Sequence, residues 1–166
     1  MPWKIDLVLM LRSIIGDLDK AKFTDERIKQ ILVVGAYNVL NDADFSETYT
    51  VNVAEISISP DPITEKDTDF STLTVYKSAC ILLGSEVKTE AANAISIKDG
   101  PSAIDLRGVT ANLSNLYNDL CAKYDALLKT YQYNNTLVGQ AILGPYSPGS
   151  MVVNGNQFDY RGNLFN

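Results

Sequence analysis

Histidine is absent from this chain of 166 residues, and cysteine and tryptophan are scarce, with two residues and one residue respectively. Without histidine, the chain lacks the commonest general base and the commonest metal ligand of proteins. Two cysteines that stand far apart in the sequence do not make a zinc site on their own. The composition therefore argues against histidine-dependent catalysis and against zinc binding.

The two cysteines, Cys80 and Cys121, each lie inside an apolar pattern of helical spacing. A cysteine in such a place usually packs as a small hydrophobic side chain. We therefore expect two buried, reduced thiols, which agrees with a chain made in the cytoplasm.

Long apolar runs are also missing, since none approaches the roughly 20 residues that span a bilayer. The opening MPWKIDLVLMLRSIIGDL has a lysine and a short apolar run, as a signal peptide does. Asp6 interrupts that run, however, and no cleavage site of small residues follows it. The sequence predicts a cytosolic protein with no membrane partner.

Basic residues are fewer than acidic ones, 14 against 20, and the imbalance is concentrated in one segment. The segment 41–69, called the acidic insert below, holds eight acids and one base, Lys66, which leaves a net charge of +1 for the rest of the chain. It is either a solvated loop or a surface that repels nucleic acid or meets a basic partner. No basic stripe favours direct DNA binding. The eight acids are Asp42, Asp44, Glu47, Glu55, Asp61, Glu65, Asp67 and Asp69.

Apolar residues at helical spacing predict four helices in residues 1–133. The second begins after a Thr24 cap, and its Gly35 lets another helix approach closely. The third runs from near Asp69 to about Asn93, and the fourth follows Gly108 as the longest. The first spans 5–18, with a stripe formed by Leu7, Met10, Leu11, Ile14, Ile15 and Leu18.

Two short stretches alternate as strands do. In the acidic insert the alternation changes phase at Ala54–Glu55, which predicts a bulge or two short strands. Around Asp99–Gly100 a turn separates two short apolar runs, and Pro101 predicts a loop longer than two residues. The fold class expected is mainly α: a helical bundle with a long C-terminal helix, a small β-hairpin or extended insert, and an extended C-terminal arm.

The last segment, 134–166, is rich in Asn and Gly yet strongly apolar. Disordered linkers are poor in such side chains, and a free apolar tail tends to aggregate. The segment therefore either packs back on its own body, 1–133, or is an arm that docks on a partner or a neighbouring copy. The candidate anchors are Leu137, Val138, Ile142, Leu143, Tyr146, Met151, Val152, Val153, Phe158, Tyr160, Leu164 and Phe165.

Motifs of catalysis are not found: the chain has no glycine-rich phosphate loop and no G-x-S-x-G. The carboxylates between Asp61 and Asp69 lack the spacing and central glycine of a calcium loop. Asp105 and Arg107 lie on one side of an extended segment, where they pair with each other or across an interface between subunits. We expect no enzyme, no cofactor and no metal site.

The order of these elements resembles the head–tail adaptor (connector, or head completion) proteins of tailed bacteriophages, which sit beneath the portal. The resemblance covers about residues 5–133 and depends on the order of three loose motifs. The acidic insert is longer than the plainest members of that family need, which suits contact with a further neck or tail protein or with the next subunit. The matching positions are Tyr76, Lys77 and Ala79; Lys98, Asp99 and Gly100; and Tyr124, Leu127, Leu128 and Tyr131.

The resemblance implies a virion protein of the neck, assembled in the host cytoplasm as a homo-oligomeric ring, usually of twelve copies. It implies a helical body, an arm that reaches the portal protein, and a channel through which DNA passes without specific binding. Asp105 and Arg107 then belong to a contact between subunits. The alternative is a small regulatory or scaffold module that uses residues 134–166 to grip one protein partner.

Overall fold

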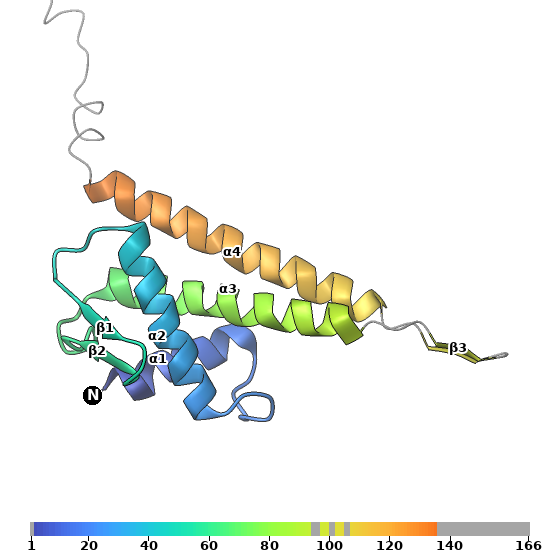
Figure 1. Ribbon diagram of the computed structural model, residues 1–166. Helices are drawn as coiled ribbons and strands as arrows, with labels where there is room; N and C mark the ends of the chain where they lie inside the picture. The colour runs from blue at the N-terminus through green and yellow to red at the C-terminus, as the bar shows by residue number, and fades with distance from the viewer. Residues whose placement is uncertain (1, 94–96, 100–101, 105–106, 136–166) are drawn as a thin grey trace, which may run out of the picture. The chain divides into compact units, whose positions relative to one another are not determined.

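Helices dominate the computed structural model of the chain, which describes residues 2–93, 97–99, 102–104 and 107–135. The chain divides into two units, Met1–Tyr131 and Gln132–Asn166. The described residues form four helices and two short antiparallel hairpins (Figure 1). The predicted mainly α fold is confirmed.

The first two helices, α1 (Trp3–Ile15) and α2 (Asp25–Asp42), begin and end at local signals. α1 ends because Gly16 takes a φ of 73°, a left-handed conformation that glycine adopts without strain. α1 is therefore shorter than the predicted 5–18. α2 begins at the predicted cap, where the Thr24 hydroxyl oxygen accepts a hydrogen bond from the Arg27 amide at 3.3 Å.

A hairpin follows α2, formed by β1 (Thr50–Asn52) and β2 (Ser57–Ser59). The side-chain oxygen of Asn52 accepts hydrogen bonds from the amides of Ala54 and Glu55, at 3.0 and 3.2 Å. An asparagine that bonds in this way fixes a turn two residues further on. The predicted break at this point of the insert is therefore confirmed as two short strands around a turn.

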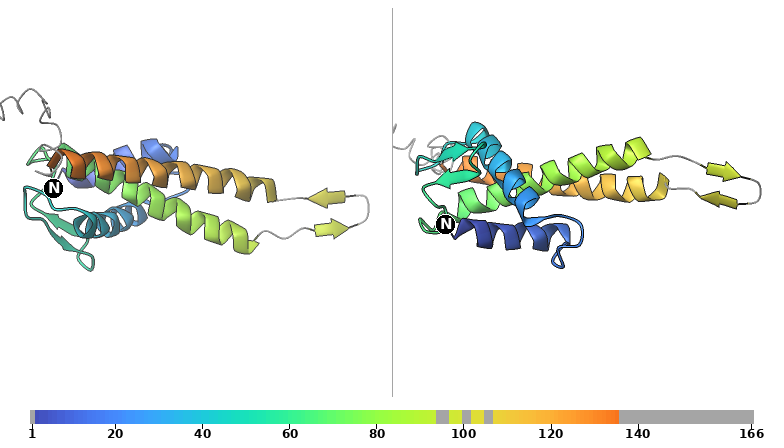
Figure 2. Two further views of the ribbon diagram at one scale, coloured as in Figure 1. Left: turned by 90° about the horizontal axis from the view of Figure 1, so that it is seen from above. Right: turned by 60° about the horizontal axis from the view of Figure 1, so that its bottom comes forward.

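Two long helices make up the second half of the described chain: α3 (Thr68–Asn93) and α4 (Arg107–Asn135). A second hairpin, β3 (Ile97–Asp99) with β4 (Ser102–Ile104), lies between them in the sequence (Figure 2). Its register pairs Asp99 with Ser102, so only two residues separate the strands. The expectation of a longer loop was wrong, because Pro101 falls between the strands, where its missing N–H costs no ladder bond.

The core is built where α1, α2 and the first half of α3 meet, with β2 over one side. Gly35 of α2 faces Ser78 of α3, and a Cβ at Gly35 would overlap the Ser78 hydroxyl. The predicted close approach of a second helix at Gly35 is confirmed. The largest fully buried apolar side chains are Trp3, Phe70, Leu7, Leu11, Ile28, Leu32, Ile58, Leu82, Val33 and Val39.

α4 lies along α3 (Figure 1) and packs against the buried core through one stripe of its surface. Leucine and tyrosine alternate along this stripe at spacings of four and three residues, the pattern of a helix that packs on one side. Only Leu120 and Tyr124 of α4 are buried among its described side chains. The stripe consists of Leu113, Tyr117, Leu120, Tyr124, Leu127 and Tyr131.

Candidate functional site

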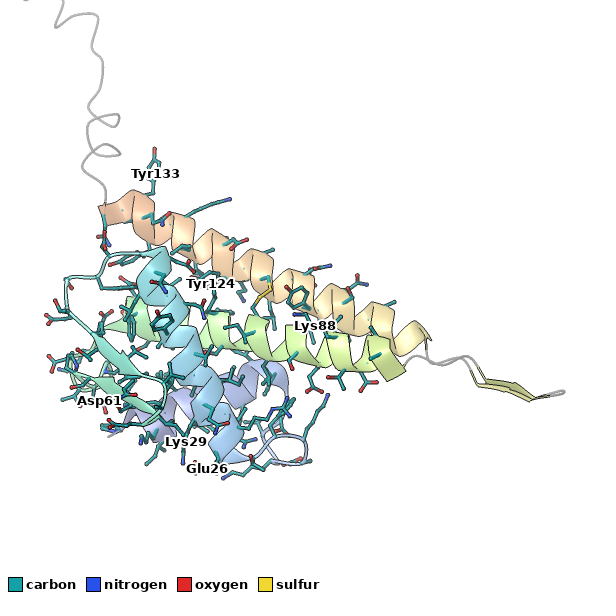
Figure 3. The ribbon with its side chains drawn as sticks, in the orientation of Figure 1. Glu26, Lys29, Asp61, Lys88, Tyr124 and Tyr133 are labelled. Atoms are coloured by element: carbon teal, nitrogen blue, oxygen red, sulfur yellow. A yellow bond between two sulfur atoms is a disulfide. The ribbon has the colours of Figure 1, made fainter. Side chains whose placement is uncertain are left out.

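Asp42, the first acid of the insert, joins three helices. Its Oδ2 atom accepts hydrogen bonds from Lys77 Nζ of α3 at 2.8 Å and from the Tyr124 hydroxyl of α4 at 2.6 Å. Partial burial acts to raise the pKa of Asp42, but the bonds from Lys77 and Tyr124 outweigh it and lower this pKa. Burial and the Asp42 carboxylate together raise the pKa of Tyr124, labelled in Figure 3, far above its ordinary value.

Two further acids of the insert also hold the fold together. Asp61 Oδ2 accepts a hydrogen bond from the Trp3 amide at 3.3 Å, at the start of α1. Asp67 caps α3, because its Oδ1 accepts from the Phe70 amide at 2.9 Å while its Oδ2 accepts from the Tyr49 hydroxyl at 2.9 Å. Burial, followed by the bond to Asp67, raises the pKa of Tyr49. Asp61 and Asp67 are therefore only partly exposed, and each binds other parts of the chain.

The exposed acidic surface is smaller than the eight acids of the sequence suggest. Five of the eight are exposed, and none of the five makes an ion pair with another described side chain. This corrects the predicted patch, because pattern alone does not tell a capping carboxylate from a solvated one. The exposed acids are Asp44, Glu47, Glu55, Glu65 and Asp69.

A groove of about 350 Å³ lies between α1 and α2 and has an apolar floor. Ile5, Leu9 and Leu18 are 72%, 58% and 58% exposed there, which is high for large aliphatic side chains. Figure 3 labels Glu26 and Lys29 near the N-terminal end of α2, the part of this helix that borders the groove. The lining of this α1–α2 groove is Lys4, Ile5, Val8, Leu9, Arg12, Leu18, Lys20, Asp25 and Lys29.

Arg12 forms the inner wall of the groove and is only 2% exposed. Its guanidinium binds Asp17 and Asp25, each at 2.7 Å, and donates to the Phe23 carbonyl at 2.8 Å. Hydrogen bonds from the Lys22 and Phe23 amides, together with Arg12, lower the pKa of Asp17 against the opposing effect of its burial. The buried charge of Arg12 is thus matched, as such a charge must be.

The lysines at the rim of the groove differ in their partners. Lys20 pairs with Asp25 at 2.8 Å, and Lys29 pairs with Glu26 at 3.0 Å. The hydrogen bonds from Lys20 and then Arg12 lower the pKa of Asp25. Within the described residues, Lys4 has no carboxylate at ion-pair distance and lies 5.6 Å from the Trp3 ring centre. Lys4 is therefore the one lining cation whose charge no described acid matches.

This groove was not predicted from the sequence. The expected apolar stripe of α1 included Met10 and Leu18, which are 46% and 58% exposed. The reason is that α1 is apolar around most of its circumference, so spacing alone does not say which face turns inward. A helix apolar on more than one face is itself the signal that could have indicated the groove. The side chains of α1 that are buried are Trp3, Leu7, Val8, Leu11 and Arg12.

Cys80 of α3 and Cys121 of α4 form a disulfide bond, with a Cα–Cα distance of 5.2 Å. Both residues are half-buried. The expectation of two buried, reduced thiols was therefore wrong, because two helical patterns read separately do not reveal that their cysteines face each other. Beside the bond, an apolar hollow of about 600 Å³ is lined by Gly84 and Tyr117 among others.

Other predicted site residues fall where little is described. The twelve candidate anchors from Leu137 to Phe165 and Asp105 lie outside the described residues. Arg107 begins α4, and its side chain is not described. In the described part of the chain, no three acidic or cysteine side chains gather as metal ligands. None of the described helices combines the length and the apolar character that a bilayer span requires.

Comparison of the chain with protein-family models, with curated proteins and with solved structures gives no significant match. Its function is therefore argued from its own surfaces and from the order of its elements.

Proposed function

We propose that this chain is a structural, non-enzymatic virion protein that forms a ring beneath the portal of a tailed bacteriophage. In this role it joins the head to the tail and continues the DNA channel. The observation that carries the proposal is the order of elements: two helices, an extended insert, and two long helices joined through a short hairpin. The same order underlies the resemblance to head–tail adaptor proteins.

Exposed apolar residues support the proposal that this chain assembles with other chains. Isolated soluble proteins rarely leave several large aliphatic side chains exposed in one place, and such places usually mark contact sites. Here Ile5, Leu9 and Leu18 form one apolar floor, and residues 134–166 add a long apolar sequence. Both features favour a protein whose surfaces are completed by other chains.

The negative charge of the chain supports the proposal that DNA passes it without binding. The net charge is −6, and the five exposed acids of the insert have no cation paired with them among the described side chains. A surface of this sign repels the phosphate backbone, whose binding requires clustered Lys and Arg. In this proposal the chain meets DNA only as the wall of a channel.

The proposal is tested by mixing the full chain with the portal ring of the same phage. Light scattering and negative-stain microscopy are expected to show a closed ring of this chain on one face of the portal. Leu143→Ser with Tyr146→Ser is expected to weaken the binding at least tenfold, because the arm then loses two apolar anchors. The matched control, Tyr37→Ser, removes an exposed tyrosine of the body and should leave the binding unchanged.

A different oligomeric state and a different partner would contradict the ring proposal. A chain that stays a monomer or dimer in the presence of the portal and grips some other single protein through residues 134–166 would overturn the ring proposal. That result would establish the alternative of a scaffold or regulatory module.

A further inference from the structure

The α1–α2 groove is an incomplete surface in two respects. Its floor exposes Ile5, Leu9 and Leu18, and its rim carries Lys4, which no described carboxylate pairs. The pairs of Lys20 and Lys29 each have at least one solvent-exposed side chain and contribute little to stability. A fitting occupant therefore brings a small apolar side chain for the floor and one carboxylate for Lys4.

The tip of the β1–β2 hairpin, residues 53–56, has this composition. Val53 is 48% exposed, and Glu55 is exposed and unpaired among the described side chains. Asn52 holds the turn through the two amide hydrogen bonds described above, so Val53 and Glu55 are presented by an ordered loop. An ordered loop loses less conformational entropy on binding than a flexible one.

We propose that the hairpin tip of one copy docks in the α1–α2 groove of a second copy of this chain. Val53 covers the floor at Ile5 and Leu9, and the Glu55 carboxylate pairs with Lys4. The contact cannot be completed within one copy as folded, because no residue of the hairpin lines the groove of its own chain.

Charge complementarity points to a second copy as the occupant. The acidic insert that carries the tip has one base against eight acids. In the groove, acids match Arg12, Lys20 and Lys29, and Lys4 is left as one unmatched positive charge among the described side chains. Opposite fields of this kind speed encounter and orient the two surfaces before contact. The chain therefore carries both halves of one complementary pair.

The two surfaces are different, so the contact is head-to-tail. An open chain of copies has one unoccupied groove at one end and one unoccupied tip at the other. Further copies therefore add until the two ends meet in a closed ring, or they continue to add as a filament. This inference deepens the proposed function and relies on it for closure of the ring, but not for the contact itself.

Charge reversal tests the contact by sedimentation velocity of the full chain at about 50 mM and about 500 mM salt, since screening weakens exposed charge pairs. Lys4→Glu alone and Glu55→Lys alone are each expected to weaken self-association at least tenfold at low salt. An equimolar mixture of the two variants is expected to associate again, because each copy offers a surface that matches one on the other.

Matched controls separate this contact from a general effect of charge or polarity. Lys129→Glu on α4 and Glu65→Lys elsewhere in the insert make the same charge changes at exposed sites outside the proposed contact and should leave association unchanged. Leu9→Ser should weaken association, whereas Met10→Ser, which alters an exposed apolar residue outside the groove lining, should not. Circular dichroism checks that each variant is folded.

The outcomes distinguish this inference from the ring proposal. A wild-type chain that is monomeric at every concentration, or variants that associate as the wild type does, overturns the contact. Portal-bound rings that tolerate both reversals leave the proposed function standing and overturn the contact alone. Filaments or dimers that respond to the reversals but never close on a portal establish the contact and overturn the ring.

Discussion

Tyr124 of α4 and Lys77 of α3 donate hydrogen bonds to the same oxygen of Asp42, at 2.6 and 2.8 Å. Lys77 Nζ also lies 4.5 Å from the centre of the Tyr124 ring, within the range of a cation–π interaction. Three helices thus meet at one carboxylate at the C-terminal end of α2.

Tyr124→Phe removes one hydrogen bond from this carboxylate and is expected to lower the free energy of unfolding by about 2 kcal/mol, since the acceptor is charged. Urea denaturation followed by circular dichroism measures the loss. Tyr37→Phe, at an exposed tyrosine of α2, is the matched control and should change the stability by less than about 0.5 kcal/mol. Equal effects of the two substitutions would contradict the role assigned to the Tyr124 hydroxyl.

Acid is expected to destabilise the fold through three aspartates. The pKa values of Asp17, Asp25 and Asp42 are all lowered in the folded chain. In the unfolded chain their carboxyl groups titrate at about 3.9, so below that pH the unfolded state binds more protons than the folded state. The stability that these three carboxylates contribute is therefore fully present above that pH. It is lost as the pH falls from there through their lowered pKa values in the folded chain. Melting temperatures measured from about pH 6 down to about pH 2 test this, and Asp42→Asn should flatten the decline.

The disulfide between Cys80 and Cys121 is expected to hold α4 against α3. It closes a loop of sequence separation 41, for which loss of chain entropy in the unfolded state predicts about 4 kcal/mol of stabilisation. Cys80→Ser with Cys121→Ser should lower the stability by that order, and a reducing agent should lower it for the wild type alone. If the reducing agent acts equally on both proteins, the bond is not the cause.

Gly35 is expected to tolerate no side chain, because a Cβ there would overlap the Ser78 hydroxyl and lie 3.1 Å from the Thr74 carbonyl oxygen. Gly35→Ala should cost about 1 to 3 kcal/mol through overpacking of α2 against α3. Adding Ser78→Ala should recover part of that loss, which a double-mutant cycle measures. Gly84→Ala should cost less, since it meets the ring of Tyr117, which can turn away.

Much of the fold was predictable because its signals are local. The Thr24 cap, the change of alternation in the insert at Ala54–Glu55 and the glycine between α2 and α3 act through neighbours in the sequence or through one missing side chain. The beginning of α2 followed from the Thr24 cap, and the bounds of α3 followed from apolar spacing.

The surfaces were less predictable because they depend on which parts of the chain meet. Asp61 and Asp67 look like surface acids until Trp3 and Tyr49 are placed beside them. The cysteines likewise become a pair only when α3 and α4 are brought together. α1 adds a different reason, since its sequence is apolar on faces that stay exposed as well as on the face that is buried.

Trp3 is the single tryptophan of the chain, fully buried at the start of α1. Its fluorescence therefore reports directly on whether α1 stays packed in the core. α4 contains no tryptophan and is tied by the disulfide and by tyrosines. Loosening of α4 is therefore expected to change the indole emission less than departure of α1 does, and the indole serves as a probe of the N-terminal helix.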